Sequence, residues 1–138
     1  NYTIMGDDVN FGSRLEGSTK SYGVPCVVSE STAERVKSDP HFTLRELDLV
    51  QVKGKKEPKR IFELLTKPVT DAVRTQLTHF EKGRMAYTAG NFAEATAHFK
   101  SALSLGEDGP SETFLERCEH LAKNPLADWK GVYEFKTK

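Results

Sequence analysis

Cysteine is almost absent from this sequence, and its scarcity excludes several classes of protein. Only Cys26 and Cys118 occur in 138 residues. They are far apart in the chain and match no metal-ligand spacing, a pattern typical of reduced cytosolic thiols rather than of a disulfide framework. The four histidines also share no ligand spacing. We therefore expect no metal site within these residues.

An excess of one charge and long apolar runs are also lacking. Lys plus Arg and Asp plus Glu both number 20, so no net field attracts the chain to nucleic acid or to an anionic membrane. No apolar run approaches the roughly 18 residues of a membrane span, and no signal-peptide pattern opens the sequence. We expect a soluble, cytoplasmic segment whose parent protein could be membrane-attached through upstream regions. Because an initiating Met is missing, we also expect a piece of a longer polypeptide.

Helix and strand signals predict an α+β region over residues 1–66. In chain order we expect a short strand in Tyr2–Met5, a turn at Gly6, a helix ending near Tyr22 and Gly23, a strand at Pro25–Ser29, and a short helix with a Ser31/Glu34 capping box. Apolar residues then alternate over Phe42–Val52, with one interruption near Arg45 and Glu46, and Arg60–Leu65 is a second strand-like run. The turn-rich basic stretch between the two runs predicts a β-hairpin.

Lys67-Pro68 ends the α+β region, and residues 67–138 have a helical pattern. We expect helices over Val69–Thr88, Phe92–Leu105 and Pro110–Lys123, the last with Ser111 as its N-cap. The spacing of small and aromatic residues around Gly83 and Phe99 resembles a single tetratricopeptide repeat unit. A lone repeat cannot bury its apolar face, so we expect the third helix to cover it and the Trp129-containing tail to pack back onto a domain.

Asn10 and Arg14 are the first candidate site residues. They are four positions apart, so an amide and a guanidinium share one face of the predicted helix, near N–H groups that favour anions. On the pattern alone, solvated surface is the favoured explanation of such a pair. The basic hairpin tip is explained first as a solvated loop. If one of its lysines contacts phosphate, Lys53 is the favoured one, because it ends a strand and precedes a glycine. For the acidic pair Asp7 and Asp8, helix capping explains the carboxylates before ion binding does.

The motifs YTIMGDDVNFGSRLEG, YGVPCVVSE and FTLRELDLVQVKGKKEPKRIFELL, in this order, resemble the second half of a class III nucleotide cyclase catalytic domain of the bacterial adenylate cyclase type. The resemblance implies a partial ferredoxin-like fold of strand–helix–strand–helix–hairpin order. It also implies that Asn10 orients the ribose of ATP and that the catalytic Arg14 stabilises charge on the α-phosphate. Thr3 would contact the base, where guanine is the alternative to adenine, and Lys53 would bind the triphosphate.

In that family Mg²⁺ or Mn²⁺ is held by aspartates that precede the region seen here, and sites form at a homodimer interface. The resemblance therefore implies a cyclic-AMP-forming lyase as the full-length protein, whereas the 138 residues alone are expected to be inactive. The helical part is similar to tails that follow some bacterial cyclase domains, and it suggests a protein partner. The alternatives are a non-catalytic nucleotide sensor and a helical adaptor.

Overall fold

Residues 18–51 and 57–134 are described by the computed structural model, and they fall into two units. The first unit contains the described residues up to Pro68 together with Tyr133 and Glu134, and the second is Val69–Val132. The first combines a sheet with short helices and the second is helical, so the predicted mixed α+β class is confirmed.

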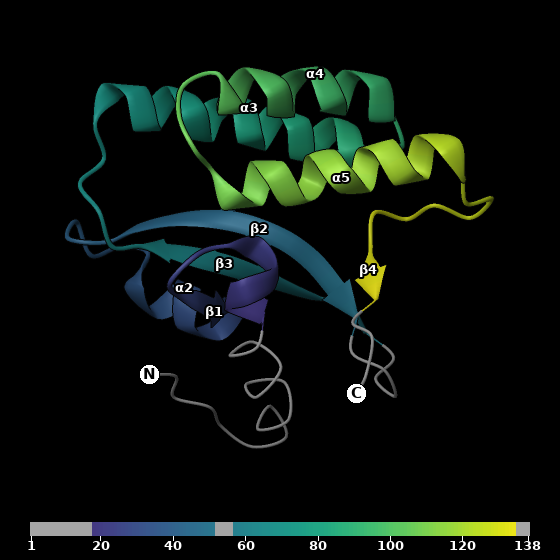
Figure 1. Ribbon diagram of the computed structural model, residues 1–138. Helices are drawn as coiled ribbons and strands as arrows, with labels where there is room; N and C mark the ends of the chain where they lie inside the picture. Colours follow the sequence, from purple (N-terminus) through teal and green to yellow (C-terminus); the bar gives the residue numbers. More distant parts are fainter. Residues whose placement is uncertain (1–17, 52–56, 135–138) are drawn as a thin grey trace. The chain divides into compact units, whose positions relative to one another are not determined.

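The first unit is built on a four-stranded sheet of order β1-β3-β2-β4 (Figure 1). The strands are β1 (Val27–Ser29), β2 (Thr43–Gln51), β3 (Lys59–Leu65) and β4 (Tyr133–Glu134). β3 pairs antiparallel with β1 and with β2, which confirms the predicted hairpin. β4 pairs in parallel with the end of β2, with Tyr133 opposite Val50. The sheet therefore takes its last strand from the far end of the chain.

A β-bulge interrupts β2 close to the predicted position. Glu46 lies opposite Phe62 and Asp48 lies opposite Ile61, so Leu47 is the extra residue. The bulge places Leu47 and Asp48 both in the interior, each 0% exposed. A carboxylate is consequently buried within an otherwise apolar strand.

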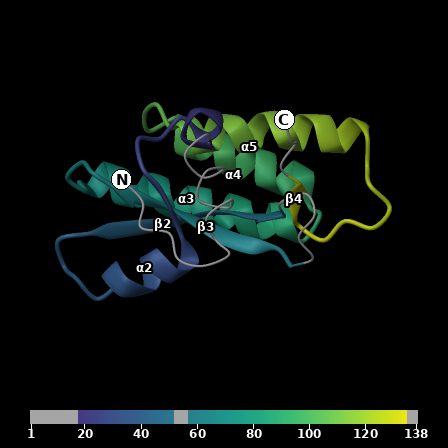
Figure 2. The ribbon, with the colours of Figure 1, turned by 90° about the horizontal axis from the view of Figure 1, so that it is seen from below.

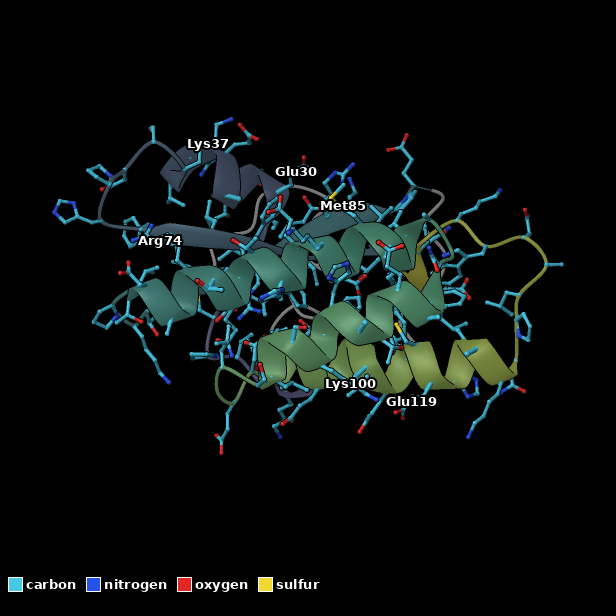
Figure 3. All side chains as sticks on the ribbon, turned by 90° about the horizontal axis from the view of Figure 1, so that it is seen from above. Glu30, Lys37, Arg74, Met85, Lys100 and Glu119 are labelled. Atoms are coloured by element: carbon cyan, nitrogen blue, oxygen red, sulfur yellow. The ribbon has the colours of Figure 1, made fainter. Side chains whose placement is uncertain are left out.

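The predicted capping of the short helix is wrong by two positions. α2 (Glu30–Val36) packs against β1 and β3 and is capped by Ser29, whose Oγ accepts a hydrogen bond from the Thr32 amide at 3.3 Å. Because the helix begins at Glu30, Ser31 already lies inside its first turn and cannot be the N-cap. Glu30 and Lys37 lie near the two ends of this helix, as Figure 3 shows, so each charge complements the helix dipole.

The second unit consists of α3 (Asp71–Thr88), α4 (Phe92–Leu103) and α5 (Gly109–Lys123), which lie side by side (Figure 1). The rings of Phe80, Phe99 and Phe114, one from each helix, lie 5.5–5.6 Å apart between centroids. All three are at most 1% exposed. The third helix therefore covers the first two, as predicted.

Ser111 is not the N-cap of α5. The helix begins at Gly109 with Pro110 in its first turn, and the N-cap is Asp108. The buried Ser111 hydroxyl instead donates a hydrogen bond to the Asp108 carboxylate at 2.5 Å. Proline is favoured at the first helical position because its missing N–H would have no partner there. The prediction placed the helix start too late.

Gly83 allows α3 and α4 to approach closely, and replacing it with alanine is expected to destabilise the helical unit. A Cβ atom at this position would lie 2.5 Å from Cε1 of Phe99, inside a packed aromatic core. Such overpacking costs about 1–3 kcal/mol, while alanine gains about 1 kcal/mol in helix propensity. We expect a net loss of up to about 2 kcal/mol in the free energy of unfolding, measured by urea denaturation.

The matched control for Gly83→Ala is Met85→Ala on the same helix. Met85 is 68% exposed and is labelled in Figure 3, so its truncation is expected to change stability by about 0.5 kcal/mol or less. A Gly83→Ala variant more stable than the wild type would contradict the close approach.

Among residues 18–51 and 57–134, no helix has the length and apolarity needed to cross a membrane.

Candidate functional site

All four predicted site residues lie outside the part of the chain that the structure describes. Thr3, Asn10 and Arg14 precede Ser18, and Lys53 lies between Gln51 and Glu57. What is described is the scaffold that these positions adjoin in the sequence. Ser18 follows Arg14 by four positions, and β2 ends two positions before Lys53.

A buried hydrogen bond joins the helix over residues 18–22 to β2. The Tyr22 hydroxyl donates to Oδ2 of Asp48 at 2.5 Å, and the Leu49 amide donates to Oδ1 of Asp48 at 2.8 Å. Tyr22 is 1% exposed and Asp48 is 0% exposed. Because buried polar groups are costly unless paired, both carboxylate oxygens have partners here. The bond fixes the end of the helix that follows Arg14 in sequence against the strand that precedes Lys53.

A buried ion pair joins β2 to β3. Arg45 Nε donates to Glu63 Oε1 at 2.9 Å, and Arg45 Nη2 lies 2.7 Å from the same oxygen. The two side chains are only 8% and 9% exposed, and the residues lie directly opposite each other in the sheet. A charge pair in this environment penalises any register in which the two charges separate. The ion pair thus favours the observed register of the hairpin.

Arg60, the first residue of the second predicted strand-like run, lies inside β3. Its Nη1 atom is 2.8 Å from Oε2 of Glu46 on β2, and both side chains are largely exposed. Such surface pairs contribute little to stability. Arg60 is thus paired across the strands, while Lys59 begins β3 and is exposed.

The described residues contain no group of three or more histidines, cysteines, aspartates or glutamates that could hold a metal ion. Both cysteines are free thiols. Burial raises the pKa of the Cys118 thiol to about 11, against a partial opposing effect of its hydrogen bond with Thr96. Thiolate is the reactive form, so Cys118 is an inert core residue at neutral pH.

Sequence analysis did not identify Tyr22, Arg45, Asp48 or Glu63. The available signal was the position of Arg45 and Asp48 within the strand-like run Phe42–Val52. A polar residue that is buried in such a run needs a partner. Sequence pattern alone could not supply the partner's identity, because each pair is separated by 18 or 26 residues along the chain.

Three proteins named adenylate cyclase are similar to this chain. The protein from Anabaena cylindrica is 43% identical over 63 residues, which are 45% of this chain and 12% of that protein. The terminal-differentiation-specific adenylate cyclase of Dictyostelium discoideum is 29% identical over 121 residues, 84% of this chain and 6% of that protein. Adenylate cyclase 1 of Rhizobium meliloti is 38% identical over 64 residues, 46% of this chain and 9% of that protein.

No family model matches the chain, and no solved structure matches it. The chain spans about an eighth or less of the length of the curated relatives described above. Over part of its length the chain is nevertheless similar to adenylate cyclases from three organisms, and these similarities support a cyclase family.

Proposed function

We propose that the chain contains the second half of a class III adenylate cyclase catalytic domain, and that the full-length protein converts ATP to cyclic AMP and pyrophosphate in intracellular signalling. The observation that carries the proposal is the 43% identity to the adenylate cyclase of Anabaena cylindrica over 63 residues. The mixed α+β unit with its antiparallel hairpin is consistent with a partial cyclase domain.

In this proposal the four candidate residues supply one share of a site formed between two subunits. Arg14 stabilises the charge that develops on the α-phosphate as the 3′-hydroxyl attacks, and Asn10 orients the ribose. Thr3 contacts the base. Its hydroxyl can both donate and accept a hydrogen bond, which is compatible with adenine. Lys53 binds the triphosphate as a point charge. The subunits form a homodimer, and the second subunit supplies the remaining contacts.

The buried polar contacts of the sheet unit suit this role. The Tyr22–Asp48 hydrogen bond and the Arg45–Glu63 ion pair hold together the elements that adjoin the candidate residues in sequence. Both contacts are buried. Catalytic side chains are effective when the elements that carry them are held rigidly. We propose that these contacts fix the helix over residues 18–22, which follows Arg14 in sequence, and β2, which precedes Lys53, in constant positions relative to each other.

Mg²⁺ or Mn²⁺ would supply Lewis-acid chemistry in the full-length enzyme. The residues that the structure describes do not fit such a site, since they offer no group of three or more potential ligands. We assign none of them to the metal ions. By the same resemblance the metal ligands are aspartates outside these 138 residues, so we expect the 138-residue chain alone to form no cyclic AMP.

The test is nucleotide turnover by the full-length protein that contains this chain. With Mg²⁺ or Mn²⁺ present, we expect cyclic AMP and pyrophosphate from ATP in equal amounts, and much less cyclic GMP from GTP. Product formation is measured by chromatography. ATP binding without any cyclic product would overturn the proposal and favour a nucleotide sensor, and the absence of both would favour a helical adaptor.

A further inference from the structure

An indole ring is held at the turn between α3 and α4, within the helical unit. It belongs to Trp129 in the segment 124–132 after α5, which we call the tail. Figure 2 shows the connection from α5 as a yellow loop beyond the end of that helix. The indole lies edge-on to the rings of Tyr87 and Phe92, with centroid distances of 5.1 and 5.3 Å. The predicted packing of the Trp129-containing tail onto a domain is therefore confirmed.

A backbone carbonyl at the end of α3 favours an indole over other rings. Trp129 Nε1 donates a hydrogen bond to the Tyr87 carbonyl oxygen at 2.8 Å. The last four carbonyls of a helix have no partner within it, and at this one the Gly90 amide also donates, at 3.0 Å. A carbonyl oxygen can accept two hydrogen bonds, whereas an indole nitrogen can only donate. The turn therefore offers an acceptor that suits tryptophan better than a purely apolar side chain.

The indole site, which we define as Tyr87, Gly90 and Phe92, is held in place by contacts that do not involve Trp129. The Tyr87 ring lies edge-on to Phe114 of α5 at 4.9 Å between centroids, and edge-on to Phe92 at 6.1 Å. Tyr87 is only 1% exposed. The packing of the three helices therefore forms the site by itself. A preformed site of this kind loses little conformational freedom when a ligand binds.

Two glycines determine which sequence fits the indole site. A Cβ atom at Gly90 would lie 3.3 Å from Cδ1 of Trp129, and a Cβ atom at Gly131 would lie 2.8 Å from Cγ2 of Thr88. Gly131 also has φ +77°, a conformation that glycine adopts without steric cost. A segment that binds as the tail does therefore needs a tryptophan followed by a glycine two positions later, a pattern that we write Trp-x-Gly.

The part of the tail that precedes Trp129 is exposed. Residues 124–128 all face solvent, and Leu126 keeps 59% of its surface accessible. Trp129, by contrast, is half-buried, and Gly131 is buried. Recognition that is concentrated on one large aromatic residue is typical of anchor residues in protein interfaces. The tail is thus similar to a short bound peptide that is tethered to the end of α5.

We propose that the indole site is a peptide-binding site for protein segments of the form Trp-x-Gly, and that residues 129–131 occupy it as an internal ligand. The residues that fill the site in the structure define the chemistry of the partner, which is a protein that presents a tryptophan and a glycine at this spacing. Such a partner reaches the site only by displacing the tail.

The tail then acts as a built-in competitor for the partner. Because it is tethered to α5, its effective concentration next to the indole site is on the order of millimolar. The apparent affinity for the partner is lowered by the fraction of molecules in which the tail is docked. This competition takes place within the helical unit, so it does not depend on whether the full-length protein is a cyclase.

The test is binding of a fluorescein-labelled peptide with the sequence of residues 124–132, NPLADWKGV, to the full-length protein, measured by fluorescence anisotropy. Trp129→Ala in the protein empties the indole site, so we expect saturable binding of the peptide with a dissociation constant Kd. The wild type should bind the peptide more weakly by the factor 1 + C/Kd, where C is the effective concentration of the tail. For a C of about 1 mM and a Kd of about 0.1 mM, that factor is about ten.

Control variants of the peptide and of the protein separate specific binding from general stickiness. The peptide with Trp129→Ala, or with Gly131→Val, should bind at least about tenfold more weakly, because the first lacks the anchor and the second places a side chain against Thr88. The peptide with Lys130→Ala should bind like the parent peptide, since Lys130 is exposed. In the protein, the matched control is Leu126→Ala, which should bind the peptide as weakly as the wild type.

If circular dichroism shows that Trp129→Ala loses helical structure, Trp129→Phe decides instead. It keeps a ring in the indole site and removes the donor to the Tyr87 carbonyl, so it should bind the peptide more tightly than the wild type does. The absence of saturable binding to the folded variant would overturn the proposal. Equal affinity of the peptide for the wild type and the folded variant would overturn it too, because the peptide would then bind elsewhere.

Discussion

Arg14→Ala in the full-length protein is expected to lower the rate of cyclic AMP formation by about 10²- to 10³-fold. In the proposed mechanism the guanidinium of Arg14 is aimed at charge that is larger in the transition state than in bound ATP. Loss of one such preorganised donor typically costs about 2.7–4 kcal/mol of transition-state stabilisation. Because the interaction is made mainly in the transition state, kcat should fall much more than KM changes. Steady-state kinetics with ATP measures both.

The matched control is Arg35→Ala, which removes an exposed arginine from the last turn of α2. This variant should retain wild-type kcat, since the proposed mechanism assigns Arg35 no contact with the nucleotide. Asn10→Ala should lower kcat by orders of magnitude as well. Thermal melting of all three variants shows whether the fold is intact. Wild-type turnover by a folded Arg14→Ala protein would refute the assigned role.

Local sequence pattern predicted the elements whose burial repeats along the chain. Period-two alternation located β2, and a strand-like run after a turn-rich stretch located β3. Periodicity of 3.6 residues located α3, α4 and α5 to within a few residues. The exact helix starts were less predictable. Ser29 caps α2 where Ser31 was expected, and Asp108 precedes α5 where Ser111 was expected. Several residues of similar capping propensity stand side by side at both starts, so propensity alone does not choose between them.

Features that depend on partners distant in sequence were not predictable in this way. β4 is a two-residue strand whose partner on β2 is more than 80 residues away, and nothing in Tyr133 and Glu134 themselves indicates a strand. The burial of Asp48 follows from the bulge at Leu47 and from the Tyr22 hydroxyl. Sequence pattern predicts the burial of a side chain only where burial repeats regularly along the chain. It does not predict burial that depends on a partner distant in sequence.

The prediction of the candidate site depended more on the family resemblance than on residue spacing. Spacing placed Asn10 and Arg14 on one helical face, but on spacing alone solvated surface was the favoured explanation. Their proposed roles came from the ordered motifs that resemble a cyclase domain. Lys53 was likewise separated from its lysine-rich surroundings by the motif and not by charge. The chemistry of the site therefore stays a prediction, whereas the structure describes the elements that adjoin it in sequence.

Glu63→Gln is expected to lower the free energy of unfolding by about 3–5 kcal/mol, because it removes the carboxylate charge that faces the buried guanidinium of Arg45. Both side chains are less than a tenth exposed, so water cannot replace the lost carboxylate. Urea denaturation measures the change. The matched control is Glu46→Gln, which removes the charge from the exposed Glu46–Arg60 pair on the same two strands. The control should cost about 1 kcal/mol or less.

Simultaneous replacement of both charged residues distinguishes two contributions to stability. One is the cost of removing a single charge from the buried pair, and the other is the net contribution of the pair itself. Arg45→Met combined with Glu63→Leu should recover most of the stability lost in Glu63→Gln, since apolar residues of similar size often replace a buried pair without loss. If the register of the hairpin depends on the pair, the double variant should be stable but should show weaker hydrogen-exchange protection along β2 and β3. A Glu63→Gln variant within about 1 kcal/mol of the wild type would contradict burial of the pair. The double variant with full protection would mean that the bulge at Leu47 alone is enough to set the register.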